Sequence, residues 1–112
     1  LAGTLSYGQQ RRLEIARAMC TRPEMLCLDE PAAGLNPVET QALSRIIRFL
    51  RQQHGITVLL IEHDMGMVME ISDHIIVLDH GDVIARGAPQ AIQANASVIA
   101  AYLGAEEEET RR

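Results

Sequence analysis

The sequence has 112 residues, of which 47% are hydrophobic, and a formal net charge of −5. This length suits one small domain, and the acidic balance argues against a nucleic-acid-binding surface, which is normally basic. No apolar run approaches the ~20 residues of a membrane-spanning helix, and because aromatic residues make up only 3%, the core is expected to be aliphatic.

The first predicted element is a helix that begins after Ser6 and ends before Pro23. Ser6 and Gln9 have the spacing of a capping box, in which each side chain accepts a hydrogen bond from the other residue's backbone N–H group. An apolar face at helical spacing is expected from Leu13, Ala16 and Cys20, widened by Ile15 and Met19.

A second helix is predicted to begin at Asn36, because an N-cap residue is followed by Pro37 and then by the acidic Glu39. Gly55 is expected to end this helix as a C-cap. The Cys20 and Cys27 spacing does not suit zinc, so the two are interpreted as free thiols.

Two apolar runs flank this second helix, at residues 25–28 and 56–61. Each is predicted to be a strand buried on both faces, and together with the helix they form a parallel βαβ unit. The carboxyl ends of parallel strands meet at one edge of a sheet, where ligands bind. That edge is therefore expected to collect the polar residues that follow each run, Asp29, Glu30, Glu62 and His63.

The remainder of the chain is predicted to be smaller elements. Asp64 caps a short helix that ends near Ile71. A hairpin, two short helices and a solvated acidic run are expected after it, at residues 75–85, 89–93, 97–103 and 106–109.

Three groups of residues could carry chemistry. Asp29 and Glu30, at the end of an apolar strand, could hold a hydrated Mg²⁺ and face an attacking water, or they could form only a polar turn. Ser6 and Gly8 lie at a helix N-terminus that favours anions, although Ser6 and Gln9 could act only as caps. A histidine at position 63 could bond a phosphate oxygen, or could be satisfied by neighbouring loop backbone.

The order and spacing of these groups resemble the ATP-binding-cassette (ABC) ATPase family. Leu5-Ser6-Tyr7-Gly8-Gln9 looks like the family's signature motif, and Met25 to Asp29 looks like its Walker B strand. Glu30 then corresponds to the catalytic carboxylate and His63 to the switch histidine. Residues 32–36, which end in Asn36, look like the D-loop that couples two active sites.

The resemblance implies a subunit that hydrolyses ATP with Mg²⁺ and pairs head to tail with a second ATPase subunit. Glu30 and His63 would be catalytic, and Asp29 would hold Mg²⁺ through water. The signature residues Ser6, Gly8 and Gln9 would act on the partner's ATP. The partners implied are membrane permease subunits and, indirectly, a periplasmic solute-binding protein, but no nucleic acid. The implied location is the cytoplasmic face of the bacterial inner membrane.

Finer features resemble the ATPase subunits of branched-chain amino-acid importers, namely residues 32–37, 61–65 and 101–104. Lipopolysaccharide-export and urea-importer ATPases share parts of this pattern and stay open as alternatives. A non-catalytic remnant or interaction module of the same fold is a further alternative, and an ABC ATPase acting on ribosomes or DNA is a more distant one.

The expected fold class is α/β. It is the C-terminal half of the P-loop NTPase fold of ABC ATPases, with parallel strands flanked by helices, a C-terminal β-hairpin and short helices. All ten basic residues are Arg, whereas a phosphate-binding loop needs a Lys. We therefore expect residues 1–104 to lack that loop, and we expect the isolated chain to be inactive. The chain begins at Leu1 rather than Met, which suggests that it starts inside a longer reading frame or after a processing step. Residues 105–112 are expected to be a disordered acidic tail.

Overall fold

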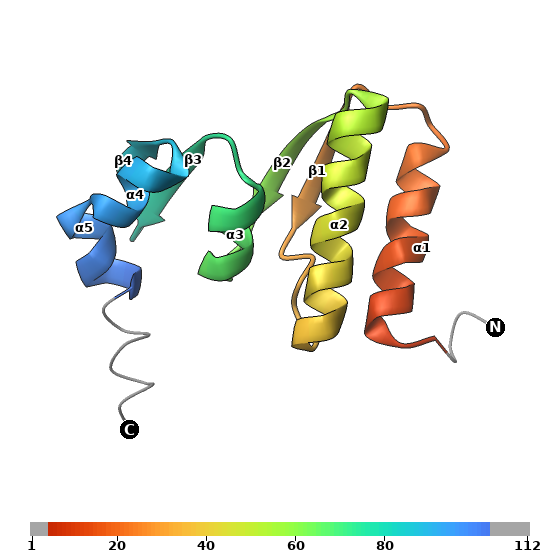
Figure 1. Cartoon of the computed structure of the whole chain (residues 1–112), viewed down its shortest axis with the longest axis horizontal. Helices are drawn as coiled ribbons and strands as arrows, with labels where there is room; N and C mark the ends of the chain where they lie inside the picture. The colour runs from red at the N-terminus through yellow and green to blue at the C-terminus, as the bar shows by residue number, and fades with distance from the viewer. Residues whose placement is uncertain (1–4, 104–112) are drawn as a thin grey trace. The chain divides into compact units, whose positions relative to one another are not determined.

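The computed structural model describes residues 5–103 (Figure 1). The chain divides between Met67 and Val68 into two compact units, which are treated separately below. Unit 1 contains a parallel two-stranded sheet with two long helices, and unit 2 contains an antiparallel hairpin with short helices. Among the described residues, no helix has both the length and the apolar character needed to cross a membrane.

Helix α1 (Tyr7–Met19) begins as predicted. The Ser6 hydroxyl accepts a hydrogen bond from the Gln9 N–H group, and the Gln9 side chain accepts one from Ser6. The predicted apolar face was wrong in part, because Ala16 and Cys20 are exposed and the buried residue is Ile15. Spacings of three and four residues allow two overlapping faces on one helix, and tertiary packing selects the one centred on Ile15.

Helix α2 (Pro37–His54) lies between the two strands in sequence and packs against α1 and β2. Asn36 and Glu39 form its capping box, and Gly55 ends it in the left-handed conformation at φ 63°, where glycine meets no Cβ penalty. The buried apolar residues of α2 form one stripe at helical spacing, as amphipathic packing requires: Leu43, Ile47 and Leu50.

Strands β1 (Met25–Asp29) and β2 (Thr57–Ile61) pair in parallel, as predicted. The prediction that both faces are buried was wrong. Leu26 is buried and Val58 is half-buried, whereas Leu59 and Ile61 on the other face are 49% and 55% exposed. Side chains alternate along a strand, so within the described structure only one face of this sheet is covered.

Helix α3 (Met65–Ile71) begins beside Asp64, whose carboxylate accepts a hydrogen bond from the Met67 N–H group at 3.1 Å, as predicted. In unit 2, β3 (Ile75–Asp79) and β4 (Asp82–Gly87) form the predicted antiparallel hairpin, with a register shift at Val77/Leu78.

His80 and Gly81 join the two strands of the hairpin, both at positive φ. This is the pattern of a type I′ turn, whose twist matches that of the strands.

Three short elements follow the hairpin: α4 (Pro89–Ala94), α5 (Ala96–Val98) and the π-helical segment η2 (Ile99–Leu103). They cover unit 2 with aliphatic side chains, since Ile92 and Val98 are almost fully buried. The hydroxyl of Tyr102 donates a hydrogen bond to the Leu78 carbonyl group, which ties η2 back to β3. The predicted C-terminal hairpin and short helices are therefore present.

Ser44 offers a test of the packing around α2. Its side chain is buried, and its hydroxyl makes no hydrogen bond within residues 5–103. An unsatisfied buried hydroxyl costs about 1–3 kcal/mol, and Ala is also the better helix former. We therefore expect Ser44→Ala to raise the free energy of unfolding by about 1 kcal/mol, measured by urea denaturation of the full-length protein. A decrease would show that the hydroxyl has a partner there.

Candidate functional site

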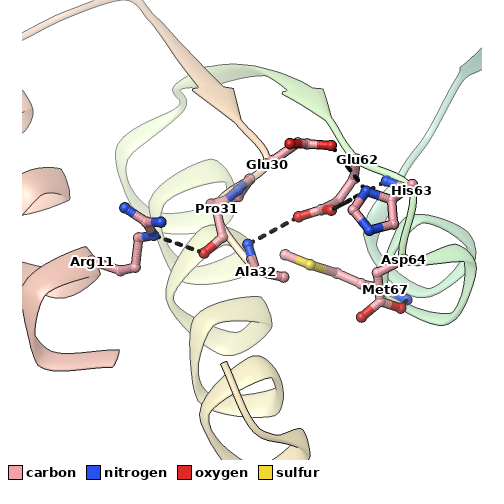
Figure 2. A network of polar contacts seen from close by, with 8 residues as sticks. All are labelled: Arg11, Glu30, Pro31, Ala32, Glu62, His63, Asp64 and Met67. Atoms are coloured by element: carbon pink, nitrogen blue, oxygen red, sulfur yellow. Dashed lines mark hydrogen bonds and ion pairs between the residues drawn. The ribbon is translucent and has the colours of Figure 1, made fainter. Parts of the chain in front are cut away.

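The carboxyl ends of β1 and β2 bring Glu30 and His63 together, as the parallel topology predicts. The backbone N–H group of Glu30 donates a hydrogen bond to the Ile61 carbonyl group at 2.7 Å, so the two strand ends stay paired up to the site. Nδ1 of His63 lies 2.9 Å from Oε1 of Glu30 (Figure 2). An ionised carboxylate only accepts hydrogen bonds, so Nδ1 is the donor in this contact. Nε2 takes no part in it.

Both side chains of this pair are open to solvent. The His63 side chain is 71% exposed and that of Glu30 is 52% exposed. Glu30 also has a positive φ of 47°, which is uncommon for a residue with a side chain. The backbone thus turns at Glu30 in a way that leaves its carboxylate accessible and in contact with the histidine.

Asp29 is the last residue of β1, in register with Ile61, and it is exposed. Among residues 5–103, no three His, Cys, Asp or Glu side chains gather closely enough to hold a metal ion by themselves. Mg²⁺ commonly takes one or two carboxylates and completes its shell with water and phosphate oxygens. Asp29 presents one exposed carboxylate at this edge, next to Glu30 in the chain.

Glu62 is part of the same edge, and no separate role was predicted for it. Its side chain is only 1% exposed. Oε2 accepts a hydrogen bond from the Ala32 N–H group at 3.0 Å, and Oε1 accepts one from the His63 N–H group at 3.2 Å (Figure 2). Strand alternation could have revealed this, because Glu62 continues the inward series of Val58 and Leu60.

The N-terminal end of α1 forms a second cluster. Ser6 and Gln9 are used in the capping box, and the Gly8 N–H group donates a hydrogen bond to Oε2 of Glu39 at 3.0 Å. Oε1 of the same carboxylate accepts a hydrogen bond from Asn36 N–H at 3.2 Å. Glu39 therefore joins the start of α1 to the start of α2, a tertiary contact that the sequence did not predict.

A surface pocket of about 210 Å³ opens at this helix tip. Backbone N–H groups at a helix start attract anions, and two arginines add positive charge, while the Glu39 carboxylate opposes it. The residues that line the pocket come from both helices and from the loop before α2: Ser6, Gly8, Gln9, Arg11, Arg12, Leu35, Glu39 and Leu43.

The loop between β1 and α2 connects the two clusters. At its start, the Pro31 carbonyl group accepts a hydrogen bond from Nε of Arg11 at 3.1 Å, and Glu62 holds Ala32 (Figure 2). At its end, the Asn36 side chain caps α2 by accepting a hydrogen bond from the Glu39 N–H group at 2.8 Å. Of the sequence-predicted residues, Glu30 and His63 are in direct contact, while Ser6, Gly8 and Gln9 lie together at the other cluster.

Comparison with known protein families gives two matches along the chain. The model described as "ABC transporter" matches residues 1–33, and the model described as "Branched-chain amino acid ATP-binding cassette transporter" matches residues 83–108. The first range holds the helix tip and the acid pair, and the second covers β4 and the segments after it.

Curated relatives cover almost the whole chain. It is 64% identical over 103 residues to the high-affinity branched-chain amino acid transport ATP-binding protein BraF of Pseudomonas aeruginosa. It is 59% identical over 103 residues to the corresponding protein LivG of Escherichia coli K12. Each match covers 92% of this chain but only 40% of the relative, so the chain spans well under half the length of these proteins.

A solved structure agrees with the fold. An ATP-binding cassette of an ABC transporter in its ADP conformation has a TM-score of 0.81 and 35% identity, over 91% of this chain and 41% of that chain. The predicted fold class, a partial P-loop NTPase fold, is confirmed. The chain belongs to the family of ABC transporter ATP-binding domains.

Proposed function

We propose that this chain is the C-terminal half of the ATP-hydrolysing subunit of an ABC importer, and that residues 1–104 carry its signature motif, Walker B strand, D-loop and switch histidine. The observation that carries the proposal is the 2.9 Å contact between Glu30 and His63, at the carboxyl ends of two parallel strands. Catalysis by a positioned carboxylate needs a group that can reach a water and a second group that fixes its orientation, and this pair supplies both.

In the proposed reaction, Glu30 orients the attacking water toward the terminal phosphate of ATP and accepts a proton from that water. Nδ1–H of His63 holds the carboxylate, and the ring is 71% exposed. In the imidazolium form both ring nitrogens donate, so Nε2–H can then donate a hydrogen bond to a phosphate oxygen. Asp29 would hold Mg²⁺ through water, and the bound ion would neutralise phosphate charge. Most of the rate enhancement then comes from positioning and charge stabilisation.

The helix tip acts on a different nucleotide in this proposal. Ser6, Gly8 and Gln9 contact the ATP held by a second ATPase subunit, packed head to tail, and Asn36 lies in the loop that faces that subunit. The positive end of the α1 dipole and the neighbouring Arg11 and Arg12 supply the attraction for phosphate. The N–H groups of Ser6, Gly8 and Gln9 donate to side chains within the chain, and in this proposal they exchange those partners for phosphate oxygens when the nucleotide binds. Each ATP is then shared between two subunits.

The open face of the sheet supports the idea that the complete domain is larger. Met25, Leu59 and Ile61 are 51%, 49% and 55% exposed on one face of β1 and β2. Parallel sheets are normally covered on both faces, so we propose that the rest of the subunit packs here. No Lys occurs in the chain, and that remainder would also supply the phosphate-binding loop.

We propose branched-chain amino acids as the transported solutes, on the basis of the 64% and 59% identity to proteins named for that transport. The proposed partners are membrane permease subunits and, through them, a periplasmic solute-binding protein. The subunit would then lie peripherally on the cytoplasmic face of the inner membrane.

The proposal predicts a clear difference between the isolated chain and the full-length subunit. We expect the 112-residue chain neither to bind Mg-ATP at micromolar concentration nor to hydrolyse it, because a phosphate-binding loop with its Lys is required. The full-length subunit is expected to do both, and calorimetry and phosphate release measure the two properties. Micromolar binding of Mg-ATP by the isolated chain would contradict the proposal that the rest of the subunit supplies the phosphate-binding loop. An inactive full-length subunit would contradict the proposed function itself.

A further inference from the structure

Glu62 holds an unusual place at the strand ends. Its side chain is 1% exposed, and burying a carboxylate is unfavourable unless hydrogen bonds compensate the lost hydration. Both oxygens are engaged, Oε2 with the Ala32 N–H group at 3.0 Å and Oε1 with the His63 N–H group at 3.2 Å. A carboxylate that bridges two backbone amides is a strong and directional link, because charge-assisted hydrogen bonds exceed neutral ones in strength.

The two amides belong to the two loops that carry the proposed catalytic pair. Ala32 lies two residues after Glu30, and His63 directly follows Glu62. Glu30 is also tied to β2 by its hydrogen bond to the Ile61 carbonyl group. The contacts therefore form a closed ring, from Glu30 through its loop to Glu62, on to His63, and back through the His63 side chain (Figure 2).

Within this ring, Glu62 sets the separation between the loops. The Glu30 and His63 side chains are largely exposed, so packing around them does little to fix their positions. The buried Glu62 carboxylate, which bonds the backbone of both loops, is what holds them in place. Without it, the Ala32 and His63 amides would need new partners, and either loop could move away from the other.

We propose that Glu62 is a positioning residue for ATP hydrolysis, which holds the loops after β1 and β2 so that Glu30 and His63 stay in contact. This inference rests on the proposed function of the site. Glu62 itself touches neither nucleotide nor water, and it acts only through the backbone of the residues that do.

The test is Glu62→Gln in the full-length subunit assembled with its permease. Gln offers one acceptor oxygen, and its NH₂ group would face a second N–H donor, so one of the two links is lost. A displacement of about 1 Å can cost ~10²-fold in rate. We expect kcat per nucleotide-binding site to fall by about 10- to 100-fold, while the KM for ATP changes by less than about threefold, because the residues that bind ATP are untouched.

Glu24→Gln is the matched control, since it makes the same chemical change at an exposed position just before β1, and its kcat and KM should equal those of wild type. If Glu62→Gln does not fold, as judged by its melting curve, Glu62→Asp replaces it. Asp keeps the charge, but it is one methylene shorter and cannot reach both amides, so the same loss of kcat is expected.

Two results would overturn the inference while leaving the proposed function intact: a wild-type kcat in the Glu62 variant, or a raised KM with unchanged kcat. A wild-type subunit that does not hydrolyse ATP at all would instead refute the proposed function, and the inference with it. The wild-type rate therefore separates the two failures.

Discussion

Replacing Glu30 with Gln is expected to slow ATP hydrolysis by the full-length subunit by at least ~10²-fold and to trap the ATP-bound dimer. Gln keeps the shape of the side chain and can still accept a hydrogen bond from Nδ1 of His63, now 2.9 Å from the carboxylate. It cannot accept a proton from the attacking water, so binding and dimer formation should survive while hydrolysis stops. Phosphate release measures the rate, and size-exclusion chromatography with and without Mg-ATP measures the dimer.

Glu24→Gln is again the matched control, because it removes one carboxylate from an exposed position in the same unit. It should hydrolyse ATP at the wild-type rate and should not accumulate a dimer. Normal turnover in Glu30→Gln would remove Glu30 from the catalytic role. Loss of hydrolysis together with loss of ATP binding would assign Glu30 to binding rather than to the chemical step.

The parts of the fold that could be predicted from sequence are those that nearby residues determine. Ser6 with Gln9, Asn36 with Glu39 and the left-handed Gly55 mark helix ends through contacts within one turn. The parallel pairing of β1 and β2 followed from two apolar runs flanking a helix. Since carboxyl ends of parallel strands share an edge, the meeting of Glu30 and His63 followed from that topology.

The features of the fold and the site that could not be predicted from the sequence depend on what packs against each element. The face of α1 centred on Ile15, and the exposure of Leu59 on β2, are decided by neighbours far along the chain. Glu62 was predicted only as a polar residue at a strand end, and its burial depends on which face of the sheet is covered. The link from Glu39 to Gly8 joins residues 31 positions apart, and no local pattern predicts such a contact.

Replacing Gly8 with Ala is expected to abolish ATP-dependent dimer formation and to lower ATP hydrolysis by about 10²-fold. A Cβ at this position would lie 2.3 Å from Oε2 of Glu39, so the Glu39 side chain must shift and its hydrogen bond with the Gly8 N–H group is disturbed. The methyl group would also lie beside the amide that, in the proposed function, meets the partner's phosphate. Light scattering with Mg-ATP and phosphate release measure the two effects.

Gly66→Ala is the matched control, because its Cβ would meet only Oδ1 of Asp64, at an ordinary 3.5 Å. It makes the same change inside a helix, where Ala is favoured over Gly by up to about 1 kcal/mol. We therefore expect Gly66→Ala to have wild-type activity and an equal or higher melting temperature.

The double variant Gly8→Ala with Glu39→Ala separates the two possible causes of the loss. Removing Glu39 removes the atom that the new methyl group meets, so the effects of the two substitutions on stability should be non-additive. If Gly8 contacts phosphate, ATP hydrolysis stays low, because the methyl group still blocks the amide. Glu39→Ala alone completes the comparison: if it lowers hydrolysis as much as Gly8→Ala does, the loss came from the broken bond between Gly8 and Glu39, and the Gly8 amide is a structural donor that ties α1 to α2 rather than a nucleotide contact.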